Sequence, residues 1–563
     1  MRWNLKPKPS EEEVTKLATE LTIDPILANL LVQRGIEDFE QAKKFFRPSL
    51  EDLHDPFLMK DMRKAVERIE KAIRSEENIL VYGDYDVDGT TSVALVASFL
   101  KTLSPTIATY IPDRYEEGYG VSYQGIDFAD DNDFSLIIAL DCGIKAIDKV
   151  AYASEKGIDF IICDHHRPGV EIPSAIAVLD PKREDCTYPY KELCGCGVGF
   201  KLIQALASQW GIPFQEITPY LDLVATAIGA DIVPMIGENR ILAYYGLQII
   251  NEAPRIGFQA ILKQVKKKKL TITDVVFIIA PRINAAGRMK HGNHAVTLLV
   301  ESDINKAAVW AAEIEQYNVD RKEADKRITT EALQQIEELK EEDRFTTVVY
   351  NEEWHKGVIG IVASRLTETY YRPTLVLTKS GDTLAGSARS VKGFDVYKAL
   401  ENCSEHIEQF GGHKYAAGLT LKEENYETFK NAFEETVRST IDPKLLDPEI
   451  TIDAELHFKD ISPKFYRILK QLAPFGPENR TPVFMSTHIS DTGNGKRVGE
   501  DGSHLRLVMQ QGNSQTITGI GFGLGDKSDI ACNGEPFKIA YTVDENEWQG
   551  TVSLQLRLKD IKS

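Results

Sequence analysis

The chain has 563 residues, which is too long for one ordinary hydrophobic core, so we expect three or four domains. Hydrophobic residues make up 42% of it and charged residues 27%, and no apolar run approaches the ~18 residues of a membrane span. This composition predicts a globular chain that is not embedded in a membrane. The first residues lack both an apolar signal segment and an Arg/Ser-rich leader, which predicts a cytoplasmic location.

The formal net charge of −19 argues against a generally basic surface of the kind that attracts phosphate groups. Solubility explains most of this acidity, and a site that concentrates carboxylates around metal ions would explain part of it. Any contact with phosphates must then depend on local basic patches. Seven cysteines are scattered along the chain, and the close pair Cys194 and Cys196 lacks the spacing of a zinc site, so we expect reduced thiols.

Residues 1–75 are predicted to be helical, because they end in a segment where apolar residues recur at three- and four-residue spacing. From residue 76 to about 303 the pattern changes to short apolar runs that end in acids or histidines, with helical stretches between them. This alternation predicts a mostly parallel sheet with helices on its faces. Ligands bind beyond the carboxyl ends of the strands in such sheets, where the polar clusters fall. The three runs are NILVYGDYDVDG, SLIIALDCGI and DFIICDHHR.

Residues 305–342 contain no Gly or Pro and are rich in strong helix formers. A continuous helix of this length spans roughly 55 Å at about 1.5 Å per residue, which is long enough to bridge two lobes. We therefore assign residues 304–343 to a connecting helix. A second α/β lobe is expected at residues 344–446, where the strand-like segments FTTVVYN and TLVLTKS occur.

Residues 447–563 alternate β-rich segments with Gly, Asn and Asp turns. A small barrel of the OB type fits this pattern, although propensity alone does not exclude a sandwich. The predicted fold class is therefore α/β, with two α/β lobes built on parallel sheets, a long helix between them, and a C-terminal β-barrel of OB type.

Asp84, Asp86 and Asp88 alternate in the sequence GDYDVDG at the end of a predicted strand. Residues at alternate positions of a strand face the same side, so these carboxylates can line one surface until the following turn re-aims the last of them. A calcium-binding EF-hand loop is the alternative interpretation. No acid sits at the later position that such a loop requires, and a run of helix formers follows at once.

Two further strand ends supply Asp141 and the triplet Asp164, His165 and His166, and Asp231 in AIGADIVP completes the set. Any one of these residues would be weak evidence, because a lone strand-end Asp usually caps a turn and a lone His is usually structural. Four strand-end clusters in order on one α/β domain indicate a metal centre. Carboxylates and imidazoles without thiolates suit Mn²⁺ or Mg²⁺ better than Zn²⁺.

The clusters resemble those of the DHH phosphoesterases, a family named for the triplet that begins at Asp164. The resemblance implies two lobes of the DHH and DHHA1 types, and two ions, Mn²⁺ or Mg²⁺, in the first lobe. It implies that Asp141 bridges the two ions and that Asp86 binds the first ion. It also implies that the second ion is bound by Asp88, His165 and Asp231, and that Asp84 and His166 lie beside the ions.

Many members of the family carry a histidine two residues before the position of Asp84, where this chain has Tyr82. Asp84 or water would then complete the coordination of the first ion. A pair of ions lowers the pKa of a bridging water and clamps both the attacking and the leaving oxygen at phosphorus. The resemblance assigns His166 a hydrogen bond or proton to the phosphate or the leaving group.

Several longer motifs resemble the RecJ-like nucleases of this family, in the same order and over nearly the whole chain. The resemblance implies a 5′-to-3′ exonuclease that degrades single-stranded DNA to 5′-mononucleotides in repair and recombination. Its partners would be a single-strand-binding protein and a helicase, and the chain would act as a monomer. The motifs are APRINAAGRMKH (280–291), NEEWHKGVIGIVASR (351–365), AGSARS (385–390), FGGHKYAAGL (410–419) and LAPFGPENRTPVF (472–484).

Two alternatives stay open at this point. A DHH-family oligoribonuclease or cyclic-dinucleotide phosphodiesterase of the two-lobed type would end near residue 440, which leaves the β-rich tail unexplained. A catalytically silent scaffold on the same fold would not be expected to keep the whole set of metal ligands. The sequence does not decide between DNA and RNA, or between Mn²⁺ and Mg²⁺.

Arg114, Ser387 and Arg389 resemble the residues that hold a 5′-terminal phosphate in the RecJ-like nucleases. Arginine forks suit the geometry of phosphate, although a lone Arg is usually a surface cation. Arg282 and Asn284 could contact phosphates, or they could make contacts that stabilise the domain.

The segment Gly411, Gly412 and His413 could let a backbone approach the substrate closely, and the alternative is a tight turn. Lys266 to Lys269 could form a phosphate track, but charge runs are more often solvated faces.

Overall fold

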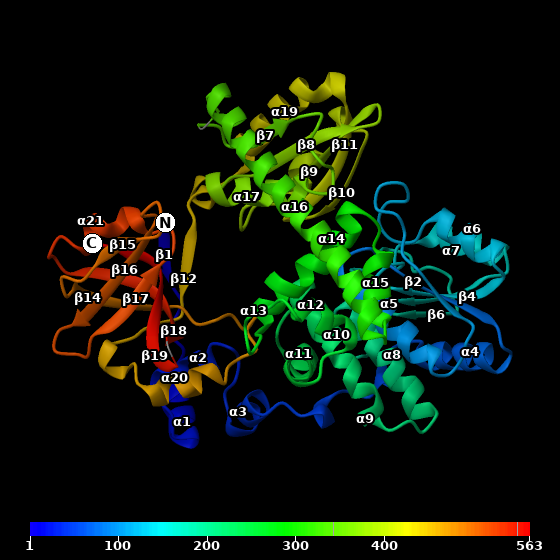
Figure 1. Cartoon of the computed structure of the whole chain (residues 1–563), viewed down its shortest axis with the longest axis horizontal. Helices are drawn as coiled ribbons and strands as arrows, with labels where there is room; N and C mark the ends of the chain where they lie inside the picture. Colours follow the sequence, from blue (N-terminus) through cyan, green and yellow to red (C-terminus); the bar gives the residue numbers. More distant parts are fainter. Residues whose placement is uncertain (342, 549) are drawn as a thin grey trace.

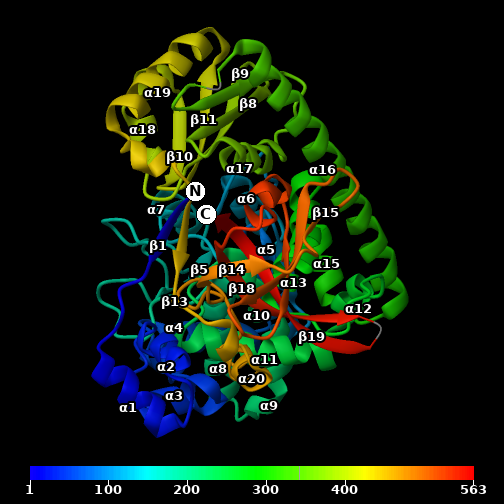
Figure 2. The same ribbon diagram turned by 90° about the vertical axis from the view of Figure 1, so that its left-hand side faces the viewer.

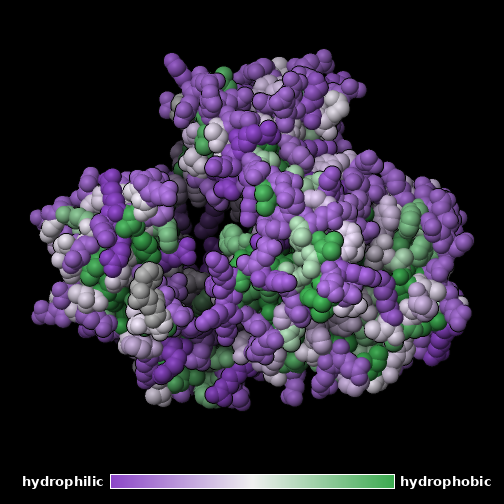
Figure 3. Space-filling model, in the orientation of Figure 1, coloured by the Kyte–Doolittle hydropathy of each residue, from purple (hydrophilic) through white to green (hydrophobic). Residues whose placement is uncertain are grey.

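The computed structural model describes residues 1–341, 343–548 and 550–563. The chain forms three lobes, with the first α/β lobe in blue to green, the second in green to yellow, and the C-terminal lobe in orange and red (Figure 1). The N-terminal helices lie along one side, below the C-terminal lobe and the first lobe. Figure 3 shows a hollow between the C-terminal lobe and the other two.

The first lobe is built on a five-stranded sheet in the order β3-β2-β4-β5-β6, and all of its strand pairs are parallel. Its strands are nearly all apolar because both faces are covered. The expectation of a parallel sheet is confirmed here. The strands are β2 (Asn78–Gly83), β3 (Ile107–Tyr110), β4 (Phe134–Leu140), β5 (Asp159–Cys163) and β6 (Ala177–Leu179).

Helices cover both faces of this sheet. On one face α4 (Met62–Arg74), α5 (Val87–Lys101) and α8 (Gly195–Gln209) form the largest apolar core. On the other face α6 (Tyr123–Asp131) and α7 (Ile147–Glu155) form a smaller one. The lobe is completed by α9 (Phe214–Ile217), α10 (Leu221–Asp231), α11 (Gly237–Glu252), α12 (Ile256–Leu262), α13 (Ile272–Asp274), the π-helical turn η4 (Val275–Ile279), α14 (Ala280–Met289) and α15 (Asn293–Val300).

The long helix α16 (Ile304–Leu339) joins the two α/β lobes, as Figure 2 shows from the side. Its 36 residues span about 54 Å. Apolar residues of its first half, including Ala307 and Ile314, belong to the core of the first lobe, and Ile328 and Ile336 belong to a core of the second. The predicted connecting helix is therefore present, and its expected end at residue 342 lies outside the described residues.

The second lobe holds a five-stranded sheet in the order β10-β11-β9-β8-β7, and this sheet is mixed rather than parallel. Only β7 and β8 are parallel. The two residues between β8 and β9 are too few for a crossover, so these strands pair as an antiparallel hairpin. The elements are β7 (Thr347–Tyr350), α17 (Ile359–Tyr370), β8 (Thr374–Ser380), β9 (Thr383–Arg389), α18 (Val396–Glu401), β10 (Gln409–His413), β11 (Ala416–Lys422) and α19 (Tyr426–Thr440).

The C-terminal lobe is β-rich, as predicted. Its strand β14 pairs with both β18 and β16, so the sheet curls in the manner of an OB-type barrel. The elements are β12 (Glu449–Ile452), β13 (Ala454–Glu455), α20 (Pro463–Lys470), β14 (Phe484–Asp491), β15 (Lys496–Val498), β16 (His504–Gln511), β17 (Ile517–Gly521), α21 (Ser528–Ala531), β18 (Phe537–Trp548) and β19 (Thr551–Lys562).

The N-terminal segment packs on the C-terminal lobe. It begins with a strand, β1 (Arg2–Leu5), which pairs in parallel with β12, where the sequence predicts only helix. Pairing with a distant strand overrides local propensity here. Leu27 and Leu30 of the second helix lie in the core of the C-terminal lobe with Phe458 and Phe465. The three helices are α1 (Glu11–Leu21), α2 (Pro25–Val32) and α3 (Phe39–Phe46).

Short 3-10 turns link several of these elements, and the cysteines are free thiols, as expected. Among the described residues, no helix is both long and apolar enough to cross a bilayer. The 3-10 turns are η1 (Leu50–Asp52), η2 (Pro56–Leu58), η3 (Thr218–Tyr220), η5 (Ser404–His406), η6 (Glu423–Asn425), η7 (Pro443–Leu446), η8 (Phe458–Asp460) and η9 (Gly525–Lys527).

Arg240 of α11 connects the first lobe to the C-terminal lobe through hydrogen bonds. Its buried guanidinium lies 3.8 Å from the centre of the Phe45 ring. It donates hydrogen bonds to the carbonyl oxygens of Phe45, Leu472, Ala473 and Pro474. Burial lowers the pKa of Arg240 to about 9, and nearby Arg34 adds to this effect.

We predict that Arg240→Met lowers the free energy of unfolding by at least ~2 kcal/mol, because several buried carbonyl groups lose their donor. Differential scanning calorimetry should show a lower melting temperature. Arg74→Met is the control, because that side chain is 76% exposed and forms an ion pair with Glu70 on the same helix. An unchanged melting temperature in Arg240→Met would contradict the role given to this side chain.

Candidate active site

Three aspartates follow the first strand of the parallel sheet, and the start of α5 fixes their positions. Asp84 comes directly after β2. Asp86 is the N-cap residue of α5, and its carboxylate accepts the backbone N–H of Gly89 at 3.0 Å. A Cβ atom at Gly89 would lie 2.3 Å from the Asp84 carbonyl oxygen, so this tight turn requires glycine. Asp88 follows in the first turn of α5, where it is buried.

The N-terminus of α8 holds the Asp88 carboxylate. The backbone N–H groups of Gly195 and Cys196 donate to it at 2.7 and 2.6 Å. The first N–H groups of a helix have no partner within the helix and carry the positive end of its dipole, so they favour a carboxylate there. A Cβ atom at Gly195 would lie 2.6 Å from the Asp141 carboxylate, so the same glycine lets α8 approach a second acid.

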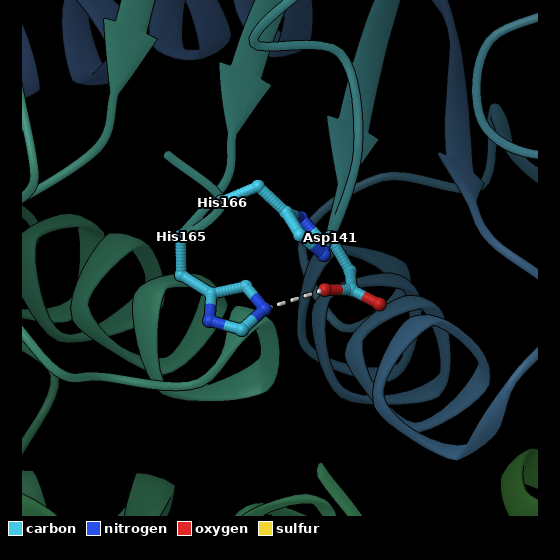
Figure 4. A group of neighbouring side chains, drawn as sticks. All are labelled: Asp141, His165 and His166. Atoms are coloured by element: carbon cyan, nitrogen blue, oxygen red, sulfur yellow. Dashed lines mark ion pairs between the residues drawn. The ribbon is translucent and has the colours of Figure 1, made fainter. Parts of the chain in front are cut away.

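Asp141 and His165 meet at the carboxyl ends of β4 and β5 (Figure 4). The Nε2 atom of His165 lies 3.1 Å from the Asp141 Oδ1 atom. The same nitrogen lies 3.7 Å from one carboxylate oxygen each of Asp88 and Asp231. One imidazole nitrogen thus faces three carboxylates that come from distant parts of the chain.

Asp231 reaches this cluster from a helix. The expectation of four strand-end clusters is wrong for this residue, because Asp231 is the last residue of α10. The next residue, Ile232, ends the helix in the left-handed conformation with φ of 59°. The helix end brings the carboxylate to the same edge of the sheet that the strand ends occupy.

Several buried atoms of the cluster make no hydrogen bond among the described residues. They are Asp84 Oδ2, Asp141 Oδ1, and both ring nitrogens of His165. Buried polar atoms are nearly always paired, so these atoms point to a missing partner. Carboxylate oxygens with one imidazole form a donor set that suits Mn²⁺ or Mg²⁺. The two groups of potential ligands with mutually close donor atoms are Asp141, His165 and His166, and Asp88, His165 and Asp231.

The raised pKa values of the aspartates also indicate that the cluster binds cations. Burial, together with the charge of Asp86, raises the pKa of Asp84 to about 8 and that of Asp231 to about 7. Burial and the neighbouring carboxylates raise the pKa values of Asp88 and Asp141 well above the usual range. The charged forms of these acids therefore need a positive partner at neutral pH.

His166 differs from His165 in its protonation. Burial and the charge of His166 lower the pKa of His165 to about 3, which leaves it neutral and free to bind a metal. The Nδ1 atom of His166 lies 2.7 Å from the Asp164 carboxylate. Burial opposes the charged form of His166, but this hydrogen bond and the surrounding acids outweigh it and raise the pKa to about 9. Asp164, which also accepts three backbone N–H groups, therefore holds His166 protonated.

Tyr82 stands where many members of the family carry a histidine, and it takes no part in the cluster. Its hydroxyl donates to the Gly120 carbonyl at 2.9 Å and lies 3.3 Å from Ser122 Oγ. Its ring stacks on Tyr110. Asp84 accepts the Gly120 N–H through one oxygen, and its other oxygen has no partner in the described part of the chain. The Asp84 carboxylate is therefore available to a metal ion.

Several arginines, Arg114, Arg288, Arg321 and Arg389, lie close together beside the acidic cluster, and we call this group of side chains, with Ser387, the arginine pocket. Arg114 stacks on the ring of Tyr85, 4.4 Å from its centre, and Tyr85 stands between two of the aspartates. Arg389 donates to Ser387 Oγ at 3.0 Å. Burial and the neighbouring arginines Arg114, Arg389 and Arg321 lower the pKa of Arg288 to about 9. Burial and Arg114 likewise lower the pKa of Arg389. These cations repel each other, so the pocket favours an anion.

The start of α17 closes this pocket. Arg288 donates to the carbonyl oxygen of Gly357 at 2.9 Å, which joins the first lobe to the second. A Cβ atom at Gly360 would lie 3.0 Å from both Ser387 Oγ and Arg389 Nη2, so glycine lets the helix approach the pocket. The positive end of a helix dipole adds to the attraction for an anion.

The remaining predicted substrate residues lie in two places. Gly411, Gly412 and His413 are the exposed last residues of β10 and pair with Gly418, Ala417 and Ala416 of β11, so they lie in a strand rather than in a tight turn. Partial burial and the charges of Arg389 and His166 lower the pKa of His413.

Arg282 is engaged within the protein. Its Nε atom pairs with Glu315 of α16, and its Nη1 atom donates to the Ile278 carbonyl. This agrees with the interpretation that Arg282 knits the domain together. Asn284 lies two residues further along α14, roughly half a turn away, and is half-buried.

Comparisons with known proteins agree with this geometry. The family model described as "DHH family, N-terminal domain" matches residues 78–228, "DHHA1 domain" matches residues 343–439, and "RecJ OB domain" matches residues 452–560. The single-stranded-DNA-specific exonuclease RecJ of Bacillus subtilis is 36% identical over 566 residues, which cover 100% of this chain and 70% of that protein. The chain belongs to the RecJ family.

Two further relatives of the family extend the comparison. The RecJ of Escherichia coli is 34% identical over 98% of this chain and 97% of its own length. The crystal structure of Thermus thermophilus RecJ in complex with Mn²⁺ covers 100% of this chain and 79% of that chain, with a TM-score of 0.86 and 27% identity. A structure of the same protein in complex with Mg²⁺ has a TM-score of 0.80, 26% identity, and coverage of 100% and 78%. Mn²⁺ or Mg²⁺ is therefore the cofactor that the family and the donor set indicate.

Two members of the arginine pocket, Arg288 and Arg321, are not predicted from the sequence. Arg288 lies in the motif APRINAAGRMKH, but nothing in the sequence distinguishes it from Arg282, which turns the other way. Arg321 lies within the long helix, where an arginine at that position looks like a solvated surface cation. Only the approach of α16 and α17 to α14 brings these cations together.

We predict that added Mn²⁺ or Mg²⁺ raises the melting temperature more at about pH 8 than at about pH 6. The folded-state pKa values of Asp84 and Asp231, about 8 and about 7, lie above the ordinary carboxyl value. The metal-free native state therefore holds extra protons and loses stability as the pH rises through this window, and a bound cation removes that loss. Scanning fluorimetry at fixed free metal concentration measures the effect. A rise that is independent of pH would contradict it.

Proposed function

We propose that this chain is a metal-dependent exonuclease specific for single-stranded DNA, which hydrolyses phosphodiester bonds from the 5′ end and releases 5′-mononucleotides. The observation that carries the proposal is the position of the arginine pocket beside the acidic cluster. Arg114 stacks on Tyr85, and Tyr85 lies between Asp84 and Asp86 in the sequence. A terminal phosphate in the pocket would leave the next phosphodiester beside the carboxylates.

We propose the following roles for the cluster. Two Mn²⁺ or Mg²⁺ ions would be held by the side chains of Asp84, Asp86, Asp88, Asp141, His165 and Asp231. When bound, the ions supply an activated water and neutralise charge at phosphorus. The amides of α8 keep Asp88 in place, and the low pKa of His165 keeps its ring neutral for binding.

His166 is the proposed proton donor of the reaction. It is protonated near neutral pH because Asp164 holds its Nδ1 atom, and its Nε2 atom lies 3.2 Å from the Tyr119 hydroxyl. Its side chain is 42% exposed, so a substrate can reach it. A protonated imidazole there donates to the phosphate oxygen or to the leaving oxygen as the bond breaks. Asp164 acts through His166 and is a positioning residue.

The pocket sets the proposed direction of degradation. Arg114, Ser387, Arg389 and Arg288 form a cationic group that would favour a terminal phosphate, and the start of α17 packs against Ser387 and Arg389. A strand that cannot continue past the pocket must enter by its end. Gly411, Gly412 and His413 would approach the strand between the pocket and the metals, and Asn284 is a further candidate contact.

Other parts of the proposal rest on the family resemblance. We propose that the chain serves DNA repair and recombination in the cytoplasm, as a monomer, together with a single-strand-binding protein and a helicase. We also propose functional units at residues 1–75, 76–303, 304–343, 344–446 and 447–563. In this division residues 76–303 carry the metals, residues 344–446 bind the strand end, and residues 447–563 extend the strand path.

We predict that Asp141→Ala lowers hydrolysis of single-stranded DNA more than about a thousandfold, because the proposed bridge between the ions is lost. Activity is measured with end-labelled strands, and circular dichroism checks that the variant is folded. Asp148→Ala, which removes an exposed acid of α7, should behave as wild type. Near-normal turnover of Asp141→Ala would rule out the two-metal assignment.

We predict that Arg389→Ala reduces the preference for 5′-phosphorylated over 5′-hydroxyl ends by about tenfold or more, because a charge-assisted phosphate contact contributes roughly 1.5–3 kcal/mol. The comparison uses kcat/KM on two strands that differ only at the 5′ end. Arg327→Ala on the exposed face of α16 is the matched control.

A circular single strand tests the same pocket independently, because it offers no end. Wild-type protein should leave the circle intact while it degrades the linear form. Rapid cutting of the circle, or mononucleotides released first from a 3′ label, would contradict both the pocket assignment and the direction of degradation.

A further inference from the structure

An exposed aromatic side chain stands on the π-helical turn η4 of the first lobe. Phe277 is 73% exposed, which is unusual for a phenylalanine in a well-packed lobe. Its neighbours Val275 and Ile279 are buried, so the turn itself is anchored. π-Helical turns are rare and often mark functional positions.

This turn packs directly against the helix that supplies a metal ligand. A Cβ atom at Gly229 of α10 would lie 3.3 Å from Val276 Cγ2, so η4 rests on the last turn of α10. Asp231 follows two residues later, and Ile232 after it is 67% exposed with φ of 59°. A β-branched residue seldom adopts this conformation. Ile232 is thus an exposed apolar side chain next to Asp231, and Phe277 stands on the turn that packs against the same helix.

Four lysines precede α13, the short helix that leads into this turn. Lys266 to Lys269 are exposed, and Lys267 pairs with Asp274 at 2.7 Å, the residue directly before η4. Phe277 follows Asp274 by three residues, which is about 5 Å along a helix axis. Within the described residues, no carboxylate lies within ion-pair distance of Lys266, Lys268 or Lys269. The loop therefore presents cations beside the exposed ring.

The helix α14 runs from just after Phe277 to Arg288 of the arginine pocket. Arg288 of the pocket lies near the end of α14, and Phe277 lies just before its start, so the two are separated by about 16 Å along the helix axis. A Cβ atom at Gly287 would lie 2.7 Å from the Tyr85 carbonyl oxygen, so α14 passes beside the aspartate turn. The segment formed by η4 and α14 thus contacts elements that carry the acidic cluster near both of its ends, through Tyr85 near Arg288 and through Gly229 near Phe277.

We propose that Phe277 stacks on a base on the 3′ side of the cleaved bond, and that Lys266, Lys268 and Lys269 bind the phosphates beyond it. This inference rests on the proposed function. Exposed aromatic rings with adjacent cations are the means by which proteins hold single strands without regard to sequence. Ile232 supports the strand between this platform and the metal cluster.

The test is a length series of 5′-phosphorylated single strands, from the dinucleotide to about 20 nucleotides. Phe277→Ala should raise KM on long strands by about 5- to 150-fold, the range that corresponds to loss of one base stack. The dinucleotide, which does not reach the platform, should keep its wild-type kcat and KM. Phe277→Trp should retain the wild-type KM, whereas Phe277→Leu should behave like Phe277→Ala. The control is Phe39→Ala, which removes an exposed ring from the N-terminal helices.

The lysines are tested by the salt dependence of binding. Lys266→Gln/Lys268→Gln should lower the slope of log affinity against log salt by about 1.4 for a long strand, since each lost phosphate contact contributes about 0.7. Lys322→Gln/Lys326→Gln removes two exposed charges from α16 and should leave the slope unchanged.

The outcomes separate this inference from the proposed function. Wild-type protein that degrades long strands, with Phe277→Ala equal to it at every length, would overturn the inference and leave the proposed function standing. An equal loss on the dinucleotide and on long strands would also overturn it, because the ring would then support the metal cluster itself. Failure of the wild-type protein to cleave any single strand would overturn both.

Discussion

Buried carboxylates that lack enough hydrogen-bond donors are the constraint around which the first lobe is organised. Asp88 and Asp141 are almost fully buried, and their pKa values lie well above the ordinary range. A protein keeps such groups together only where a cation compensates them, since an uncompensated buried charge is very unfavourable. The close helix approaches at Gly89 and Gly195 serve this arrangement. The start of α8, which approaches Asp141 closely at Gly195, also supplies the backbone N–H groups of Gly195 and Cys196 that hold Asp88 in place.

The arginine pocket also brings like charges close together, but these charges are positive and come from both α/β lobes. Burial, together with the charge of nearby Arg114, lowers the pKa values of Arg288 and Arg389, and Arg389 also lowers that of Arg288. Neither lobe alone builds this pocket, because Arg288 comes from α14 and Arg389 from β9. The long helix α16 belongs to the cores of both lobes and so fixes the distance between them. The distance between the acidic cluster and the arginine pocket therefore depends on α16.

The sequence predicts most of the acidic cluster because strand periodicity is local. Asp84, Asp86 and Asp141 follow apolar runs that a sequence reveals directly, and parallel strands bring their ends to one edge. Asp231 was placed on a strand end, but it ends a helix, and only tertiary packing shows this. Arg321 and the strand β1 escape prediction for the same reason, since their partners are far away in the sequence. The second sheet is mixed because a two-residue connection decides strand direction more strongly than apolar pattern does.

The net charge of −19 is compatible with a nucleic-acid substrate because charge acts locally in salt solution. At physiological ionic strength the field of an exposed charge is screened within about 8 Å, so acids on distant surfaces hardly affect a phosphate in the pocket. Buried cations such as Arg288 are screened far less and dominate the potential that a bound phosphate experiences. Bound metal ions would also cancel much of the charge of the acidic cluster. The position of a few buried cations, rather than the total charge, therefore decides where a polyanion can bind this protein.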